Sequence, residues 1–368
     1  MRFLPLLAAF IGLTAAVPLA ENVPRDNNNT QVESSGAKTC RKPIVRKEWR
    51  TLSIPERKRY LAAVLCLTKK PSKAPSGAAP GARHRYDDFN TVHIIMSDGF
   101  LTGSGGVHMV GFFLHWHRYF VATYEQALRD ECGYTGAQPY WNWSLDAASG
   151  LPMEQWPIYN PDYGFGGNGP YTTDHNATVS WPYQAGQTGG GCVSDGPFVN
   201  MTVNVGPGLQ IGYNPHCLHR GLNPDTIPAL KKENTDAALL KGSFVEFDTA
   251  VQGAQDMKPE DGITIFHGAG HYAQGGDSTD FISSTSEPIF WLHHAYIDYL
   301  YWQWQQKNPE VRLSEVGGVR LPFNPSGGNV TLDQPLNLKW EADTIPLSRV
   351  MDIQGLGKDG GVLCYDYE

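Results

Sequence analysis

Histidines recur in this chain at spacings that would let several imidazole rings share a metal ion. Two adjacent ones, His293 and His294, stand inside an apolar stretch, Glu287-Pro-Ile-Phe-Trp-Leu-His-His-Ala-Tyr-Ile-Asp298, whose spacings of three and four residues predict one helix face. His267 and His271 form a His-x-x-x-His pair, and a helix projects both rings of such a pair from the same side. Because a buried imidazole without a hydrogen-bond partner costs about 1–3 kcal/mol, these rings require partners.

The first half of the chain carries a matching set of histidines. His93 ends the stretch Phe89-Asn-Thr-Val-His93, His108 follows the glycine-rich segment 99–106, and His117 belongs to Phe112-Phe-Leu-His-Trp-His-Arg118. Each half thus supplies one set of imidazoles, namely His93, His108 and His117, then His267, His271 and His294. Imidazoles without carboxylates or thiolates in the pattern suit copper better than magnesium or calcium, so we expect two copper ions as cofactors.

Other metal chemistries fit the pattern less well. His-x-x-x-His on a helix is also a feature of zinc hydrolases, but Gly268 stands where their general-base Glu would follow the first histidine. A ferritin-like di-iron site needs Glu-x-x-His pairs, which these segments lack. A single histidine on an apolar face is more often a hydrogen-bonded core residue, which is our interpretation of His84, His175, His216 and His219.

Helices must position these rings. We predict a mainly α fold in which a four-helix bundle holds a dicopper site, with long loops and a few short strands. One helix carries His93 and a long one spans about 113–132. Others are expected around 227–252, 261–272 and 287–306. Ser53-Ile-Pro-Glu56 is a capping-box start for a further helix. The 40 glycines and 26 prolines favour irregular connections, above all a wrapped loop over 151–228 with a possible strand at 199–205.

The amino terminus predicts export. Residues 1–16 combine one arginine, a short apolar core and small residues, which is typical of a secretory signal peptide, and 17–39 form a polar leader. We therefore expect a secreted, extracellular protein whose six cysteines are oxidised, with the pairs Cys40–Cys364, Cys66–Cys132 and Cys192–Cys217 chosen from fifteen possible pairings. Glycosylation sequons stand at Asn28, Asn176, Asn200 and Asn329, and a fifth, at Asn142, lies in an aromatic segment expected to be buried.

Charge and hydropathy exclude two classes of partner. The formal net charge is −8, and no basic cluster offers an electrostatic footprint for nucleic acid. After the signal peptide no run of 18 apolar residues follows, so we expect no membrane partner either.

Two of these stretches resemble known signatures. Phe112-Phe-Leu-His-Trp-His-Arg118 resembles the Phe-Leu-Pro-Trp-His-Arg signature of the type-3 copper proteins, which are the tyrosinases, catechol oxidases and haemocyanins. The stretch from Glu287 to Asp298 resembles their second-copper signature, Asp-Pro-x-Phe-x-x-His-His-x-x-x-Asp. The resemblance extends from about Arg46 to Tyr367, and the chain looks most like the fungal short tyrosinases and catechol oxidases. The resemblance implies that residues 40–368 form a tyrosinase-like catalytic domain.

The resemblance also implies roles for single residues. Copper A would be held by His93, His108 and His117, and copper B by His267, His271 and His294, the second histidine of the adjacent pair being the ligand in that family. The supporting residues expected beside these ligands are His293 and Asp298, and His115 is expected to be either a hydrogen-bonded surface residue or a supporting one. Those expected in the substrate pocket are Gly268, Tyr272 and Phe290, although Phe290 could instead pack against a ligand ring. Tyr365-Asp-Tyr367 resembles the motif that closes the catalytic core, with Arg46 its expected partner and no shielding domain after it.

Departures from the family pattern shape the expected activity. His115 stands where the family commonly has Pro, and Gly106 offers no thiol for the thioether that many fungal relatives form near the second copper A histidine. Gly268 replaces the Asn that helps strong monophenolases hold a water. The resemblance therefore implies an enzyme that uses dioxygen to oxidise o-diphenols to o-quinones, with weaker monophenol hydroxylation. An o-aminophenol oxidase, a full tyrosinase and a non-catalytic dioxygen carrier remain as alternatives.

Overall fold

The computed structural model describes residues 39–100, 102–176, 178, 182–253, 265–358 and 360–368. The expected signal peptide, all of the expected leader except Thr39, and the sequon at Asn28 lie outside this range.

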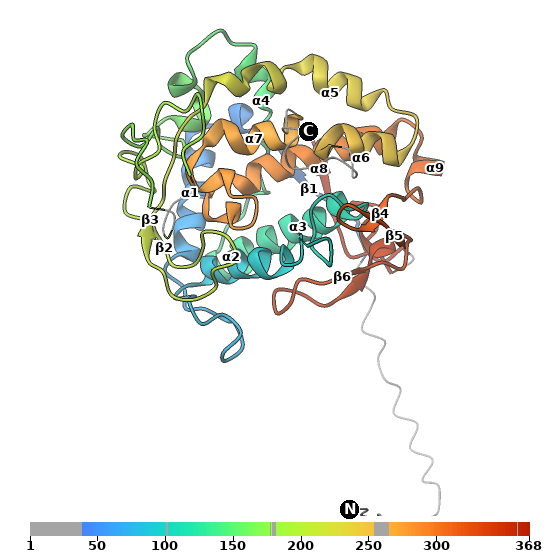
Figure 1. Ribbon diagram of the computed structural model, residues 1–368. Helices are drawn as coiled ribbons and strands as arrows, with labels where there is room; N and C mark the ends of the chain where they lie inside the picture. Colours follow the sequence, from blue (N-terminus) through green and yellow to red (C-terminus); the bar gives the residue numbers. More distant parts are fainter. Residues whose placement is uncertain (1–38, 101, 177, 179–181, 254–264, 359) are drawn as a thin grey trace, which may run out of the picture. The chain divides into compact units, whose positions relative to one another are not determined.

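The described chain is mainly helical, as predicted (Figure 1). Its α-helices are α1 (Ile54–Leu67), α2 (Arg85–Met96), α3 (Phe113–Cys132), α4 (Trp143–Ala147), α5 (Lys232–Leu239), α6 (Phe244–Gln252), α7 (Phe266–Gln274), α8 (Phe290–Gln306) and α9 (Pro309–Arg312). The strands are short and pair two by two: parallel β1 (Ile44–Arg46) with β8 (Tyr365–Tyr367), and antiparallel β2 (Thr202–Val203) with β3 (His216–Cys217), β4 (Val319–Leu321) with β5 (Asn324–Asn329), and β6 (Pro335–Leu336) with β7 (Ile345–Pro346).

The helices α2, α3, α7 and α8 carry the predicted ligands, and α7 and α8 lie above α2 and α3 in Figure 1. α8 is buried on almost every side, which its run of Phe, Trp, Tyr and Leu allows. Trp291 of α8 stacks on Tyr124 of α3 with ring centroids 3.7 Å apart, and Phe89 of α2 meets the Trp291 ring at 5.7 Å. Aromatic packing therefore fixes the helices that bear the histidines against each other.

Local signals set the helix ends. Ser53 and Glu56 form the predicted capping box at the start of α1, and Ser243 and Glu246 form another at the start of α6. Gly133 ends α3 with a φ of 65°, the left-handed conformation that glycine adopts without steric cost.

A buried ion cluster joins the helix carrying His117 to the helix carrying His294. Asp298 of α8 accepts from the Nε of Arg118 at 2.5 Å and from the Nη1 of Arg46 at 3.3 Å. The hydroxyls of Tyr365 and Tyr367 each donate to its Oδ2 at 2.6 Å. Burial alone would raise the pKa of Asp298, but Arg118 and then Arg46 hold that pKa below its usual value. The tyrosine motif thus closes the core on Arg46, as the sequence indicated.

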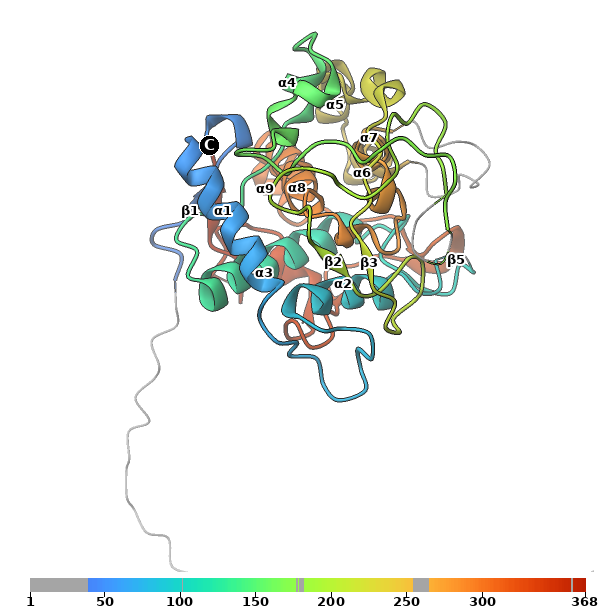
Figure 2. The ribbon, with the colours of Figure 1, turned by 90° about the vertical axis from the view of Figure 1, so that its left-hand side faces the viewer.

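Several predicted boundaries are corrected. The region 227–252 contains a 3-10 helix (Pro224–Leu230) followed by α5 and α6, which are separated at 240–243 where Gly242 stands. α7 begins at Phe266 rather than 261, and residues 261–264 lie outside the described chain. The strand expected at 199–205 shrinks to β2, since only Thr202 and Val203 find a partner. The irregular segment over 151–223 otherwise matches its prediction and faces the viewer in Figure 2.

The disulfides follow the expected pairing, and the sequons differ in exposure. All three disulfides form between the expected partners, Cys40–Cys364, Cys66–Cys132 and Cys192–Cys217. Asn176, Asn200 and Asn329 are exposed, whereas Asn142 is half-buried and its Oδ1 accepts from the Ser144 hydroxyl. In the part of the chain that the structure describes, no helix has the length and apolar character needed to cross a bilayer.

Candidate metal centre

Three histidines from the first half of the chain converge. A ring nitrogen from each of His93, His108 and His117 lies within 4.8 Å of the others. The Nδ1 of His93 lies 2.8 Å from the carbonyl oxygen of Ile282, and that of His117 lies 2.9 Å from the Phe113 carbonyl oxygen. A carbonyl oxygen can only accept, so each Nδ1 carries the proton and each Nε2 keeps its lone pair. Both Nε2 atoms are buried and have no hydrogen-bond partner.

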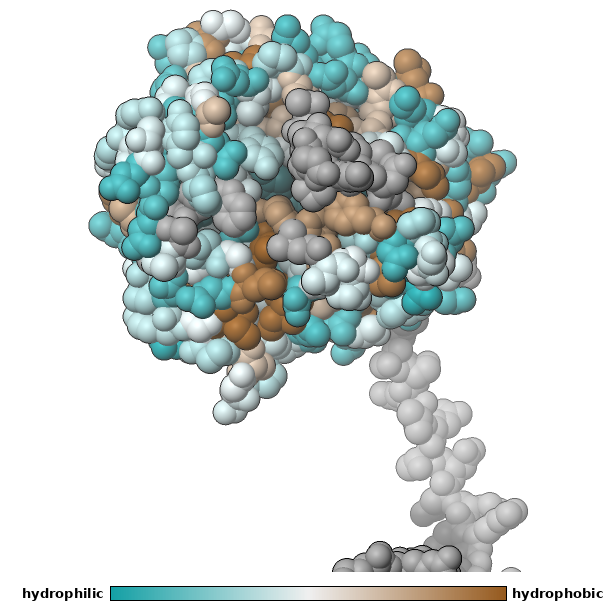
Figure 3. All heavy atoms as spheres, viewed as in Figure 1, coloured by the Kyte–Doolittle hydropathy of each residue, from teal (hydrophilic) through white to brown (hydrophobic). Residues whose placement is uncertain are grey.

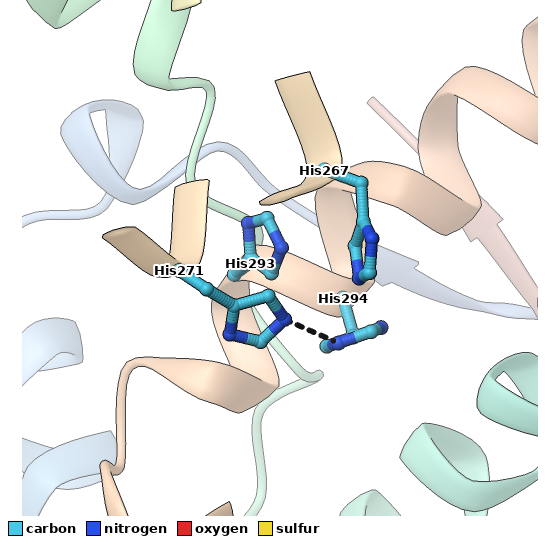
Figure 4. A group of neighbouring side chains, drawn as sticks. All are labelled: His267, His271, His293 and His294. Atoms are coloured by element: carbon cyan, nitrogen blue, oxygen red, sulfur yellow. Dashed lines mark hydrogen bonds between the residues drawn. The ribbon is translucent and has the colours of Figure 1, made fainter. Parts of the chain in front are cut away.

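Four histidines from the second half form the facing group, drawn in Figure 4. Their ring nitrogens also lie within 4.8 Å of one another, in the group His267, His271, His293 and His294. The Nε2 atoms of His271 and His294 are 3.2 Å apart, and the Nδ1 of His271 lies 3.4 Å from the Ser278 hydroxyl. Two nitrogen lone pairs directed at one point repel each other unless a proton or a cation lies between them.

Both His293 and His294 lie within this distance of the other rings, so we distinguish them by the direction in which each ring points. His294 stacks on His117 with centroids 4.4 Å apart and an interplanar angle of 13°, so its ring faces the first group. His293 instead lies against Trp143 at 5.0 Å and against the backbone of α7, where a Cβ on Gly270 would overlap its ring. This arrangement favours His294 as the ligand and gives His293 a position behind His267 and His271.

Burial keeps these imidazoles neutral. It lowers the pKa of His93 to about 4 and that of His271 to about 3. Burial is also the largest cause, followed by neighbouring imidazoles, that holds the pKa well below its usual value at His108, His117, His267 and His294. Neutral rings have free lone pairs at neutral pH, so protons do not compete with a metal there.

The site therefore fits two copper ions. Both groups consist of histidine alone among the described residues, which suits copper better than the hard cations. The Nε2 atoms of His93, His117 and His267 are among the buried ring nitrogens of the site that have no hydrogen-bond partner, and metal coordination would satisfy them. Three imidazoles for each copper would leave coordination positions for exogenous ligands.

The expected supporting and pocket residues lie in different places. The expectation that His115 supports a ligand ring is corrected: its Nε2 lies 2.8 Å from the Tyr301 hydroxyl and its ring packs on Phe244, because residues two apart on α3 point to opposite sides. Asp298 serves the ion cluster rather than a histidine ring. Phe290 is fully buried and contacts His294 at 4.2 Å and His93 at 5.3 Å, so it packs against the ligand rings, the alternative considered for it.

Gly268 and Tyr272 follow the two copper B histidines of α7 directly. Gly268 is buried and Tyr272 is half-buried. Their place in the substrate pocket stays a prediction.

Sequence reasoning missed other residues of the site. Phe113 contacts His117 at 4.5 Å and His267 at 4.7 Å, and thus packs between the two groups. Its position four residues before His117 on one helix face was an available signal. The carbonyl of Ile282, which orients His93, comes from a segment 189 residues away, and no local sequence pattern predicts such a contact.

Together, the helical fold and the paired histidine groups define a dinuclear metal protein of the copper-oxidase type. The common central domain of tyrosinase matches residues 83–307. Tyrosinase ustQ of Aspergillus flavus is 36% identical over 341 residues, which cover 89% of this chain and 80% of that protein. N-acetyl-6-hydroxytryptophan oxidase ivoB of Emericella nidulans is 31% identical, with 88% and 92% covered. The chain belongs to the tyrosinase family and is a copper-dependent oxidoreductase.

Two solved structures share the fold of this chain. A single-residue variant of the polyphenol oxidase from Thermothelomyces thermophila has a TM-score of 0.76 and 34% identity, covering 89% of both chains. A functional unit of octopus haemocyanin, at 17% identity and a TM-score of 0.52, shares the fold alone, covering 88% of this chain and 68% of that one.

Proposed function

We propose that this protein is a secreted polyphenol oxidase that uses dioxygen to oxidise o-diphenols to o-quinones and hydroxylates monophenols more weakly. The observation that carries the proposal is the pair of facing all-histidine groups, linked by the stacked rings of His117 and His294. Copper ions bound there by His93, His108, His117, His267, His271 and His294 would supply dioxygen binding and accept the two electrons of the diphenol.

The approach to the site is aromatic. His267 is half-buried, and His108 is 8% exposed while His93 and His294 are almost completely buried. The Phe281 ring lies 5.9 Å from the His108 ring and 4.6 Å from that of Phe100. Apolar surface gathers on the middle and lower part of the face shown in Figure 3. A phenolic ring entering beside His108 would therefore meet apolar walls, which suits an aromatic substrate.

The weaker monophenol reaction follows from Gly268. Hydroxylating a monophenol requires its phenolate, so a base must lie within hydrogen-bond reach of the phenol, directly or through one water. Gly268 has no side chain with which to hold such a water. An o-diphenol is only oxidised and not hydroxylated, so its reaction depends less on such a base.

Export is supported by the disulfides and by exposed sequons. Three disulfides tie the described chain, and Asn176, Asn200 and Asn329 are accessible to glycosylation. Both features suit the secretory route that residues 1–16 predict.

The alternatives rest on the same site. A relative named N-acetyl-6-hydroxytryptophan oxidase favours a variant of the proposal in which one hydroxylated aromatic metabolite is the substrate. An o-aminophenol oxidase and a full tyrosinase would use the same histidines, as would a dioxygen carrier.

A steady-state panel separates these possibilities. Purified protein is assayed for oxygen consumption with catechol, a matched monophenol and an o-aminophenol. We expect the highest kcat/KM for catechol. Equal values for tyrosol and hydroxytyrosol would identify a full tyrosinase, a preference for o-aminophenol would identify that oxidase, and reversible dioxygen binding without turnover would identify a carrier.

A further inference from the structure

His108 differs from the other proposed ligands in having no helix to hold it. It lies in the irregular chain between α2 and α3, whereas the others lie in α2, α3, α7 and α8. Met109, directly after it, has a φ of 54°, a left-handed conformation that residues other than glycine adopt only under constraint. Among the described residues, the Nδ1 of His108 has one hydrogen-bond partner, the Ser97 hydroxyl at 3.5 Å. The position of His108 therefore depends on ring contacts, such as the one with Phe281 at 5.9 Å, and on the backbone that follows it.

The side chain of Gln252 contacts that backbone. Gln252 is the last residue of α6 and is 3% exposed. Its Oε1 accepts from the Met109 backbone N–H at 2.8 Å, and its Nε2 donates to the Val110 carbonyl at 3.0 Å. Nε2 also donates to Asp248, one helical turn earlier, at 2.8 Å. The side-chain amide of Gln252 thus accepts from one backbone group after His108 and donates to the next. Because the Asp248 carboxylate accepts a hydrogen bond, its contact identifies which end of the amide is the NH2 group.

Backbone contacts hold the same segment from the other side. The N–H of Gly111 donates to the Val319 carbonyl at 2.9 Å, and a Cβ at position 111 would overlap the Gly317 carbonyl. The segment 109–111 is therefore clamped between α6 and the β4 hairpin. The contact with α6 is made by the Gln252 side chain, whereas the contact with the β4 hairpin is made by backbone atoms.

We propose that Gln252 is a positioning residue for copper A, acting through the backbone that follows His108. The proposal rests on the copper A assignment made above. Both ends of the amide are required: a methionine at 252 has similar length but neither donor nor acceptor, and an asparagine is one methylene too short to reach. Either change leaves the Met109 N–H and the Val110 carbonyl unpaired and frees the left-handed turn to relax, which moves the His108 ring away from His93 and His117.

The experiment compares Gln252→Met with a matched control, Gln138→Met. Gln138 is also a fully buried amide, and its Nε2 donates to the Tyr60 hydroxyl at 2.9 Å and to the Pro139 carbonyl at 3.1 Å, contacts that do not involve the site. Copper content is measured by elemental analysis, and frozen samples are examined by electron paramagnetic resonance. A coupled copper(II) pair gives no resonance, whereas a lone copper(II) ion does.

We expect copper A to bind about 10–100-fold more weakly in Gln252→Met, leaving one copper per chain and a mononuclear copper(II) signal. Excess copper should restore the second ion and the oxidase activity. The control should keep a silent pair even if it unfolds at a lower temperature. Gln252→Asn should repeat the result and serves if the methionine variant does not fold.

A silent copper pair with wild-type affinity in the Gln252 variants would overturn the inference, as would an equal copper loss in Gln138→Met. Failure of the proposed function looks different, because the wild-type protein itself would then lack a copper pair or fail to oxidise phenols.

Discussion

Exchanging one histidine of the adjacent pair in α8 separates a ligand from its support. His294→Ala removes a ring whose Nε2 lies 3.2 Å from that of His271 and which stacks on His117. Copper B would then keep only His267 and His271 as protein donors. We expect the loss of copper B, and with it the loss of oxidase activity, since the proposed reaction requires both copper ions.

His293→Ala should act more weakly, because its ring supports the site from behind. Removing a group that orients metal ligands costs about 10–100-fold in metal affinity, or roughly 1.4–2.7 kcal/mol. Its contacts with Trp143 and with the backbone at Gly270 place His293 in that class. We therefore expect the His293 variant to lose copper during dialysis but to regain both copper ions and activity at saturating copper, whereas His294→Ala regains only one.

The assay is a copper titration of the metal-free variants, followed by elemental analysis and oxygen consumption. His84→Ala is the control, since His84 caps α2 by accepting from the Asp87 N–H and should change stability without changing copper content. A His293 variant that stays empty and inactive at saturating copper, or a His294 variant that refills completely, would refute the assignment within the pair.

Three further predictions concern stability and specificity. Burial raises the pKa of Glu48 to about 7, so the contribution of this carboxyl group to stability should fall as pH rises from about 4.5 to 7, and Glu48→Gln should exceed wild type by about 3 kcal/mol at pH 8 but nearly match it at pH 5 in thermal unfolding; a stability difference between the two proteins that does not change with pH would contradict this. Asp298→Asn leaves the buried Arg46 and Arg118 without their shared carboxylate and should cost about 3–5 kcal/mol in denaturant unfolding, whereas a loss under 1 kcal/mol would show the cluster to be dispensable. The kcat/KM for simple catechols should exceed that for matched monophenols at least about tenfold, or roughly 1.4 kcal/mol, and Gly268→Asn should narrow this gap in the same oxygen assay; an unchanged ratio would place the base elsewhere.

The helices and most of the histidine ligands could be predicted from the sequence, because both depend on the spacing of residues along the chain. His267 with His271, and the apolar pattern around His294, place rings on one helix face whatever the rest of the fold does. The aromatic residues and the capping boxes at Ser53 and Ser243 are local signals as well. These ligands could therefore be placed on helix faces before any tertiary contact was known, whereas His108 lies between two helices and has no such local signal.

Long-range contacts could not be predicted in this way. The Ile282 carbonyl orients His93, and Gln252 holds the segment after His108 across 143 residues of sequence. His115 was misplaced because the motif set it beside His117 in sequence, while the 100° step of a helix turns the two rings to opposite faces. The strand expected at 199–205 was too long because a strand extends only as far as its partner does.

Copper stoichiometry in active protein tests the central claim most directly. Elemental analysis of purified wild-type protein that oxidises catechol should find two copper ions per chain and no stoichiometric zinc, and the oxidised copper pair should give no paramagnetic resonance. An active preparation that contains stoichiometric zinc, or a single copper ion per chain, would contradict the account.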